Sequence, residues 1–382
     1  MGEIPKIAIL GGGVGGLVAA SELNYRLGTK AEITLFDRSS HHIYQPAFLH
    51  LAFGERKLDS IKRPLDLLNR QGINFLKGEI FRIDPENLLI NAEHGDFEFD
   101  YMIIALGAEL DTSGLEGFED NALNLYSADG AQSINQALSD FSGGKIAIVV
   151  SSMPYKCPAA PYEMAFLLDY HLRNKKIRER TEIVIATPEP QPMPVAGEKV
   201  GQAVADMLSK LEIEYLPNQK IKSLGQYVSL ADKKFKADLI IGVPPHRCPD
   251  VAKDADLTSK NGWIEVEGQG MATKFDNVYA IGDCTVITLP NGKALPKAGV
   301  FAKSQAQILA FNLAHQITKS SAAQKKFDGQ GGCFLEVGHK KAAYAKGNFY
   351  HEPDPLINLK APSRIYYYFK MLYEKYWLKA WI

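Results

Sequence analysis

Three glycines near the start of the chain, Gly11, Gly13 and Gly16, follow the spacing G-x-G-x-x-G. An apolar run at 6–10 precedes them, and apolar residues at helical spacing follow at 17–27. This order predicts a β-strand, a tight turn and an α-helix. Glycines in such a turn let the backbone approach a pyrophosphate at the positive end of the helix. The pattern predicts a nucleotide site, the alternative being a turn that is merely rich in glycine.

An acidic residue follows at the expected distance. A second apolar run at 32–36 ends at Asp37, and Arg38 comes next. In dinucleotide-binding βαβ units, an acid about 20 residues beyond the last glycine accepts a hydrogen bond from a ribose hydroxyl. Asp37 and Arg38 are therefore candidate cofactor-binding residues.

Two later apolar runs also end in glycine. The first covers 101–106 and ends at Gly107, and the second covers 277–281 and ends at Gly282 and Asp283. Both are predicted to be buried strands of the nucleotide-binding domain. Their terminal residues are further candidates for contact with the cofactor. For Asp283 the alternative is an ordinary turn at the end of a strand.

Strands and helices alternate again between these two runs. The predicted strands cover 145–150, 182–186 and 237–242, and the predicted helices begin near 161 and cover 199–210. Such alternation is typical of parallel sheets with helices on both faces. The predicted fold class is α/β, with a cofactor domain at 1–112 and 270–320 interrupted by a second Rossmann-like domain at 113–269. A separate C-terminal segment is predicted at 321–382.

Composition excludes several classes of protein. The 43 Lys and Arg residues balance 44 Asp and Glu residues, so no overall positive field attracts nucleic acid. No window approaches the roughly 20 apolar residues that span a bilayer. No secretory signal precedes the first strand, so we expect the chain to stay in the cytosol. Four cysteines are too few for a disulfide scaffold, and a pair in a reducing compartment is more often catalytic.

The first strand of the second domain lacks a glycine fingerprint. The segment 149–163 reads VVSSMPYKCPAAPYE, so side chains stand where a pyrophosphate needs bare backbone. This disfavours binding of a nicotinamide cofactor. Cys157 lies at the mouth of this strand-to-helix turn beside Lys156, which predicts a thiolate of low pKa. The alternative is an inert cysteine in a proline-rich loop.

The chain resembles the flavoprotein disulfide reductase superfamily along nearly its whole length. Within it, the segment 154–163 is similar to the active-site segment of sulfide:quinone oxidoreductases and of the related flavocytochrome c sulfide dehydrogenase flavoprotein. The segment 331–336, GGCFLE, resembles the strand that carries the partner cysteine in that family. Two further stretches, 295–299 and 244–246, also resemble family elements.

The resemblance implies a cofactor and a set of site residues. It implies FAD at the N-terminal glycines, with Gly282 and Asp283 supporting the ribityl chain. It further implies the catalytic residues: Cys157 and Cys333 as a redox pair next to the flavin ring, Glu163 as a nearby acid or base, and Lys297 beside the flavin or the quinone.

The chain departs from the family pattern in three places. The segment 126–129 has no third cysteine, which bears on how long a polysulfide the protein can build. The segment 187–195 lacks a histidine that is often present there. The segment 41–46, HHIYQP, lacks the cysteine that attaches flavin covalently in the flavocytochrome branch. We therefore expect FAD to be bound non-covalently.

The remaining cysteines and the paired histidines indicate no additional site. Cys248 lies in a predicted loop, where it is either a reserve thiol or, as we favour, a residue without a function. Cys284 follows Asp283 and is expected to pack against the cofactor turn. His41 and His42 have no metal-ligand spacing with any cysteine, so no metal site is predicted.

The C-terminal segment is predicted to contain an amphipathic helix at 364–382. At 3.6 residues per turn, one arc is apolar and aromatic and carries Ile365, Tyr366, Phe369, Leu372, Tyr373, Tyr376, Trp377 and Ala380. The opposite arc is charged and carries Arg364, Lys370, Glu374, Lys375 and Lys379. The pattern favours a helix lying in a membrane interface, and hence a peripheral protein on the cytoplasmic side. The alternative is a helix docked on its own domain or on a second subunit of a homo-oligomer.

These features lead to one functional hypothesis and several alternatives. Hydrosulfide attacks a Cys157–Cys333 link, and electrons pass through FAD to a quinone, leaving persulfide or polysulfide sulfur. The alternatives are a type II NADH:quinone dehydrogenase, a sulfide dehydrogenase subunit that donates to a cytochrome, and a non-enzymatic FAD-stabilised binding module or redox sensor.

Overall fold

A computed structural model describes residues 3–382, so the first two residues of the predicted cofactor domain lie outside the described residues. A parallel sheet has the strand order β21-β9-β1-β2-β5. Its strands are β1 (Lys6–Leu10), β2 (Glu32–Asp37), β5 (Asn74–Lys77), β9 (Tyr101–Ile104) and β21 (Val278–Ala280). Strand β1 is central because every residue after Lys6 is a buried apolar one. Helix α1 (Val14–Leu27) follows it, and α8 (Gly299–Ile317) packs against α1.

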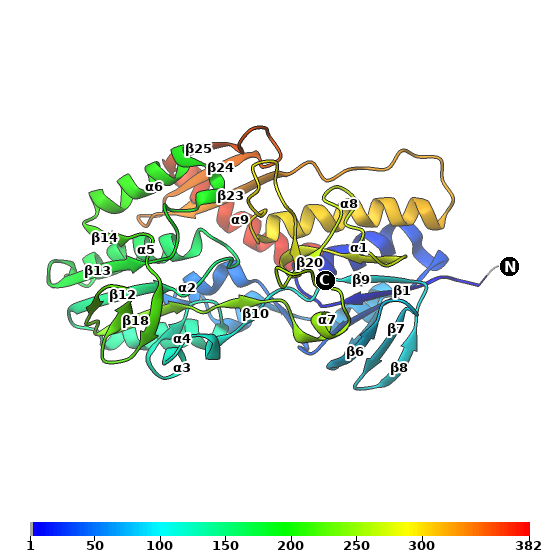
Figure 1. Ribbon diagram of the computed structural model, residues 1–382, viewed down its shortest axis with the longest axis horizontal. Helices are drawn as coiled ribbons and strands as arrows, with labels where there is room; N and C mark the ends of the chain where they lie inside the picture. The colour runs from blue at the N-terminus through cyan, green and yellow to red at the C-terminus, as the bar shows by residue number, and fades with distance from the viewer. Residues whose placement is uncertain (1–2) are drawn as a thin grey trace.

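A second parallel sheet has the strand order β11-β18-β12-β13-β14. The strands are β11 (Leu123–Asn124), β12 (Gly144–Val150), β13 (Thr181–Ala186), β14 (Ile213–Leu216) and β18 (Leu239–Val243). Its accompanying helices are α4 (Ala128–Asp140), α5 (Ala160–Asn174) and α6 (Glu198–Lys210). The two parallel sheets lie at opposite ends of the elongated molecule (Figure 1).

Short antiparallel elements decorate both sheets. The two three-stranded sheets are β6 (Ile80–Asp84), β7 (Leu89–Ala92) and β8 (Gly95–Glu98), and β15 (Ile221–Leu224), β16 (Val228–Leu230) and β17 (Lys234–Phe235). The strand pairs are β3 (His41–Ile43) with β4 (Lys62–Pro64), β10 (Glu109–Leu110) with β19 (His246–Arg247), and β20 (Ile264–Glu265) with β22 (Thr285–Val286). Three short helices are α2 (Phe48–Ala52), α3 (Phe118–Asn121) and α7 (Asp250–Asp254).

The C-terminal segment forms an antiparallel sheet and a long helix. Strands β23 (Gln330–Glu336), β24 (Ala342–Asn348) and β25 (Leu356–Ser363) pair in that order. Helix α9 (Arg364–Ala380) begins where the Ser363 side chain accepts a hydrogen bond from the Tyr366 amide at 3.3 Å. The helix lies between the two ends of the molecule (Figure 1) and contacts both.

The orientation of α9 corrects one prediction. Lys370 and Glu374, which were placed on a solvent-facing charged arc, are buried, as is Trp377 from the apolar arc. The exposed side is aromatic and aliphatic and carries Ile365, Tyr368, Phe369, Leu372, Tyr373 and Tyr376. The physical reason is that the buried Lys370 and Glu374 have ion-pair partners in the body of the protein. None of the helices within residues 3–382 is long and apolar enough to cross a membrane.

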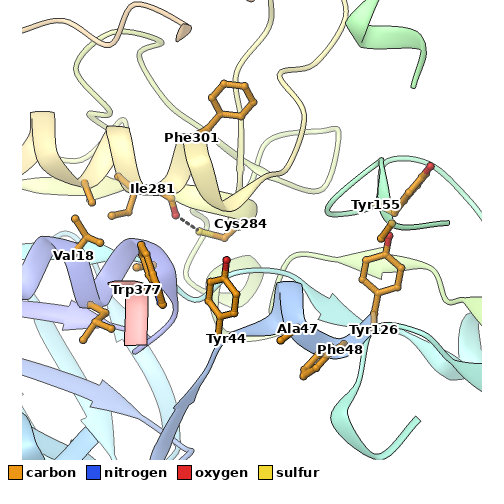
Figure 2. Close-up of a cluster of buried hydrophobic side chains, with 14 of the residues drawn as sticks. Val18, Tyr44, Ala47, Phe48, Tyr126, Tyr155, Ile281, Cys284, Phe301 and Trp377 are labelled. Carbon is orange, nitrogen blue, oxygen red and sulfur yellow. Dashed lines mark hydrogen bonds between the residues drawn. The ribbon is translucent and has the colours of Figure 1, made fainter. Parts of the chain in front are cut away.

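The core joins α9 to the first sheet. Trp377 packs among Tyr44, Val18 and other buried side chains (Figure 2). Its indole Nε1 donates to His42 Nε2 at 3.0 Å, and His42 Nδ1 bonds the Gly12 carbonyl oxygen at 3.0 Å. The C-terminal helix is therefore connected directly to the glycine turn that follows β1.

Candidate active site

The glycine turn between β1 and α1 has the shape that a phosphate requires. Gly11 has φ +108°, which side-chain-bearing residues rarely adopt. A Cβ on Gly16 would lie 1.8 Å from the Gly11 carbonyl oxygen, so only glycine fits. A Cβ on Gly13 would meet no described atom within 4 Å, and no side chain of residues 3–382 caps α1 there. The free amides of this helix end therefore face open space, as a pyrophosphate site needs.

Asp37 holds the same turn in place. Its carboxylate accepts hydrogen bonds from the Gly12 amide at 2.6 Å and from the Ser39 amide at 2.7 Å. Contact between Asp37 and a ribose hydroxyl stays a prediction. Arg38 is exposed, and its guanidinium lies 3.5 Å from the Glu109 carboxylate at the rim of this region. Gly107 has φ +71° and, among the described atoms, none within 4 Å of an added Cβ.

Asp283 is a buried carboxyl group with an unused oxygen. Its Oδ1 atom has no hydrogen-bond partner among residues 3–382. Burial raises the pKa of Asp283, although Lys156 and Lys297 oppose the shift. The preceding Gly282 has φ +77°, and its amide donates to the Gln305 side chain at 2.8 Å. A buried acceptor without a partner is what a ribityl hydroxyl of FAD would satisfy, so the residues present fit the predicted cofactor.

Lys297 lines the same small pocket as Asp283. Its ammonium donates to the carbonyl oxygens of Asp283 and Thr285, both at 2.8 Å, and lies 3.3 Å from the centroid of the Trp263 ring. Burial lowers the pKa of Lys297 to about 8. The Lys297 carbonyl oxygen accepts a hydrogen bond from the Cys157 amide at 2.7 Å. The backbone therefore ties the predicted lysine to the predicted cysteine.

Cys157 and Cys333 are both free thiols on different parts of the fold. Cys157 precedes α5 with φ +49°, and its carbonyl oxygen accepts from the Tyr126 hydroxyl at 3.1 Å. Cys333 lies on β23. Burial raises the pKa of Cys157, and the charge of Cys333 raises it further, so the two thiols are close enough to interact electrostatically.

The thiol environment corrects the prediction of a low-pKa thiolate at Cys157. Burial dominates, and the cation that opposes it is Lys370 rather than the neighbouring Lys156. Burial among protein atoms also raises the pKa of Cys333 to about 11, although that side chain retains accessible surface. Both facts agree with a thiol that borders a recess in the protein.

An ionic network lies beside the two thiols. The ammonium of Lys370 on α9 is 2.7 Å from Glu163 Oε1 on α5 and 3.0 Å from Glu336 Oε2 on β23. The Glu336 amide also donates to Glu163 Oε1 at 2.8 Å. Burial favours neutral Glu336, but Lys370 and His50 outweigh it and lower its pKa to about 2. Glu163 thus lies beside the cysteines as predicted, in a network that sequence reasoning missed.

The turn after β12 is closed by tyrosines. Glu189, just beyond β13, is buried and accepts from the hydroxyls of Tyr155 at 2.9 Å and Tyr162 at 2.5 Å. Thr187 contributes a third bond at 3.2 Å. A carboxylate after the second strand of a βαβ unit is where a nicotinamide dinucleotide places its ribose. Here that carboxylate is already occupied by the protein's own hydroxyls.

The other two cysteines are buried, and burial raises the pKa of each. Cys284 Sγ donates to the Ile281 carbonyl oxygen at 3.3 Å (Figure 2), and Cys248 Sγ to that of Cys284 at 3.7 Å. The same view shows Tyr126 and Tyr155 with their rings edge to face, 6.5 Å apart. Sequence reasoning missed these tyrosines because an apolar ring in a loop carries no periodic signal.

Comparisons with known proteins agree with this geometry. The family model described as pyridine nucleotide-disulphide oxidoreductase matches residues 5–308. The mitochondrial sulfide:quinone oxidoreductase of Mus musculus is 24% identical over 97% of this chain and 87% of its own length. A type II NADH:quinone oxidoreductase of Staphylococcus saprophyticus is 23% identical over 81% of each. The solved sulfide:quinone oxidoreductase of Aquifex aeolicus superposes with a TM-score of 0.89, at 25% identity, over 98% of this chain and 90% of that one. The predicted α/β Rossmann-like flavoprotein fold is confirmed.

Proposed function

The chain belongs to the pyridine nucleotide-disulphide oxidoreductase family, and from this premise we propose that it oxidises sulfide and passes the electrons to a quinone. It is an FAD-dependent oxidoreductase, as the proteins of this family are. The observation that carries the proposal is the electrostatic coupling of Cys157 with Cys333 beside the charged pair Glu163 and Lys370. The names of the mouse and Aquifex relatives agree with the substrate pair.

In the proposed reaction the resting pair is a Cys157–Cys333 disulfide. Hydrosulfide attacks one sulfur, where a new S–S bond forms, and the bond between the cysteines breaks. Cys333 leaves as a thiolate, and Cys157 carries the persulfide. Joining the two again through the added sulfur releases two electrons and one proton. The charge of Lys370 lowers the pKa of Cys333 against burial and Glu163, which stabilises the leaving thiolate.

FAD, bound non-covalently, supplies two-electron transfer between the cysteines and the quinone. The proposed holding residues are the glycines of the first turn, the residues that follow β2, and the later strand ends: Gly11, Gly13, Gly16, Asp37, Arg38, Gly107, Gly282 and Asp283. Covalent attachment is not proposed because no cysteine is present at 41–46.

Type II NADH:quinone dehydrogenase is the second candidate, because one of the relatives has that name. Two features of the second βαβ unit count against it. Side chains replace the glycine fingerprint at 151–156. The Glu189 carboxylate is buried under Tyr155 and Tyr162, so a nicotinamide ribose would have to displace two hydroxyls.

The quinone is proposed to come from a membrane on which the protein lies peripherally, on the cytoplasmic side. The exposed side of α9 presents the apolar and aromatic residues Phe369, Leu372 and Tyr376 to solvent. Exposed basic residues, Lys375 and Lys379, lie on the same helix and suit anionic headgroups. A soluble subunit that donates to a cytochrome would not need this surface.

The test is an anaerobic titration followed at the flavin absorbance band. Sulfide is expected to bleach the flavin of the wild-type protein, and NADH to leave it unchanged. Cys157→Ser and Cys333→Ser are expected to abolish bleaching by sulfide but not by dithionite. Cys248→Ser is the matched control, because Cys248 is buried away from the pair and should leave bleaching intact.

Each competing function has a different outcome in this assay. Bleaching by NADH would favour the dehydrogenase. Bleaching by sulfide that survives both serine substitutions would refute the cysteine mechanism. Bleaching followed by rapid electron transfer to a cytochrome, with none to a quinone analogue, would favour the soluble subunit. Negligible turnover despite bound flavin would favour a sensor or binding module.

A further inference from the structure

A chain of ionisable side chains leads away from the cysteine pair toward solvent. Beyond Glu163 and Lys370, the Glu336 carboxylate contacts His50 Nε2 at 3.1 Å. The other ring nitrogen, His50 Nδ1, contacts Glu55 Oε2 at 2.9 Å. Every step in this series is therefore within hydrogen-bond distance.

Only the far end of the chain reaches water. The side chains of Glu163, Lys370, Glu336 and His50 are all buried, whereas that of Glu55 is 46% exposed. The members come from α5, α9, β23, α2 and the turn after α2. Side chains from five separate elements thus form one continuous hydrogen-bonded path from the site to the surface.

His50 is built to pass a proton along this path. An imidazole can accept a proton on one ring nitrogen while it releases one from the other. Here each ring nitrogen has its own carboxylate, Glu55 on the solvent side and Glu336 on the inner side. Burial opposes protonation of His50, but these two hydrogen bonds outweigh burial and raise its pKa.

The other charged groups around His50 do not offer an equivalent route. Arg56 pairs with Glu374 at 2.7 Å, and a guanidinium does not release its proton. His171 contacts the Phe53 ring, and its Nε2 atom has no partner among residues 3–382. Tyr367 lies near Glu336 and Glu55, but burial raises its pKa.

The reaction needs such a route because it consumes a proton. Oxidation of HS⁻ to the sulfane level yields one proton and two electrons, and reduction of a quinone takes up two electrons and two protons. The sum is HS⁻ + quinone + H⁺ → S⁰ + quinol, so one proton per turnover comes from solvent. Helix α9 covers this region of the protein with the buried Lys370 and Trp377.

We propose that His50 and Glu55 form the entry of a proton relay that supplies quinone reduction through Glu336 and Lys370. This inference rests on the proposed function. Glu55 takes a proton from water and passes it to His50 Nδ1. His50 then releases the proton on Nε2 to Glu336, from which it reaches Lys370 and Glu163. No electron moves in these steps, and one proton enters for each that leaves.

The test separates the two half-reactions in the FAD-loaded protein. The variants are His50→Gln and Glu55→Gln, with His171→Gln as the control from the same neighbourhood but outside the relay. Flavin is first reduced anaerobically with sulfide, and then reoxidised by a short-chain ubiquinone analogue in stopped flow. A pH indicator in weak buffer records proton uptake at the same time.

The relay predicts a selective defect. Bleaching by sulfide should stay within about twofold of wild type in all variants. Reoxidation and proton uptake should slow together by about tenfold or more in His50→Gln and Glu55→Gln, since positioned proton transfer contributes about 100-fold or more. The slowed step should show a larger solvent deuterium isotope effect, and free imidazole should partly restore it in His50→Gln. The His171→Gln control should match wild type.

Other outcomes overturn the relay. Reoxidation within twofold of the control at every pH from about 5.5 to 8.5 would do so, and so would equal losses in both half-reactions with lower thermal stability. If His50→Gln does not fold, the exposed Glu55→Gln variant decides alone. If sulfide fails to bleach the wild type, the proposed function fails, and reduction with dithionite still tests the relay separately.

Discussion

Replacement of Lys370 by methionine tests the electrostatics that hold α9 in place. In the native protein Lys370 keeps Glu336 ionised, with a pKa of about 2 against an ordinary value near 4.5. That shift corresponds to roughly 3 kcal/mol of folding free energy, at about 1.4 kcal/mol per unit. Lys370→Met also leaves two buried carboxylates without their cation. We expect a loss of about 3–5 kcal/mol in the free energy of unfolding at pH 8.

The pH dependence has a definite sign. Because the folded-state pKa of Glu336 is depressed, its stabilisation is present above about pH 4.5 and is lost as the pH falls toward 2. In Lys370→Met, burial alone acts on this carboxyl group and favours its protonation. The difference between the variant and wild type should therefore shrink as the pH falls from 8 to about 5.

Guanidinium unfolding followed by tryptophan fluorescence is the suitable assay, because Trp377 lies on α9 and Trp381 directly follows it. Lys375→Met, on the exposed side of the same helix, is the matched control. The double variant Lys370→Met with Glu336→Gln should recover part of the loss, since it removes one uncompensated charge. A loss for Lys370→Met within 1 kcal/mol of the control, or one that is independent of pH, would refute this reasoning.

Three further substitutions have direct expectations. Gly16→Ala places a Cβ 1.8 Å from a backbone oxygen, so the purified protein should carry little flavin by its absorbance near 450 nm. Phe369→Ser with Leu372→Ser removes exposed apolar area from α9 and should abolish cosedimentation with anionic lipid vesicles, while sulfide still bleaches the flavin. Tyr162→Phe takes one donor from buried Glu189 and should lower the free energy of unfolding by about 1–3 kcal/mol in urea.

Local patterns along the chain were enough to predict the glycine turn and its βαβ unit. The G-x-G-x-x-G spacing constrains backbone conformation directly, and Gly11 and Gly16 have the geometry that spacing requires. The position of Cys157 at the start of a helix also follows from neighbouring residues. Pairing with Cys333 depended on family resemblance, because no local rule links two residues so far apart.

The orientation of α9 could not be predicted from helical periodicity alone. The pattern identified an apolar arc and a charged arc, and burial of the apolar arc is the usual outcome. Here Lys370 and Glu374 face inward because Glu163, Glu336 and Arg56 supply opposite charges there. A lysine and a glutamate four residues apart in an otherwise aromatic helix were the available signal.

The low-pKa prediction for Cys157 failed for a similar reason. Adjacency of Lys156 in sequence said nothing of its side chain in space, and burial dominates the pKa of the thiol. The contacts of Glu189 were equally invisible, since the hydroxyls of Tyr155 and Tyr162 reach it only through the packing of α5 on the second sheet.

The most direct test of the central claim is peptide mapping of the oxidised protein by mass spectrometry, after alkylation of free thiols without reduction. The account predicts that Cys157 and Cys333 are joined, directly or through one added sulfur after exposure to sulfide. Cys248 and Cys284 should be recovered alkylated. Recovery of Cys157 and Cys333 as separate alkylated peptides from protein that oxidises sulfide would contradict it.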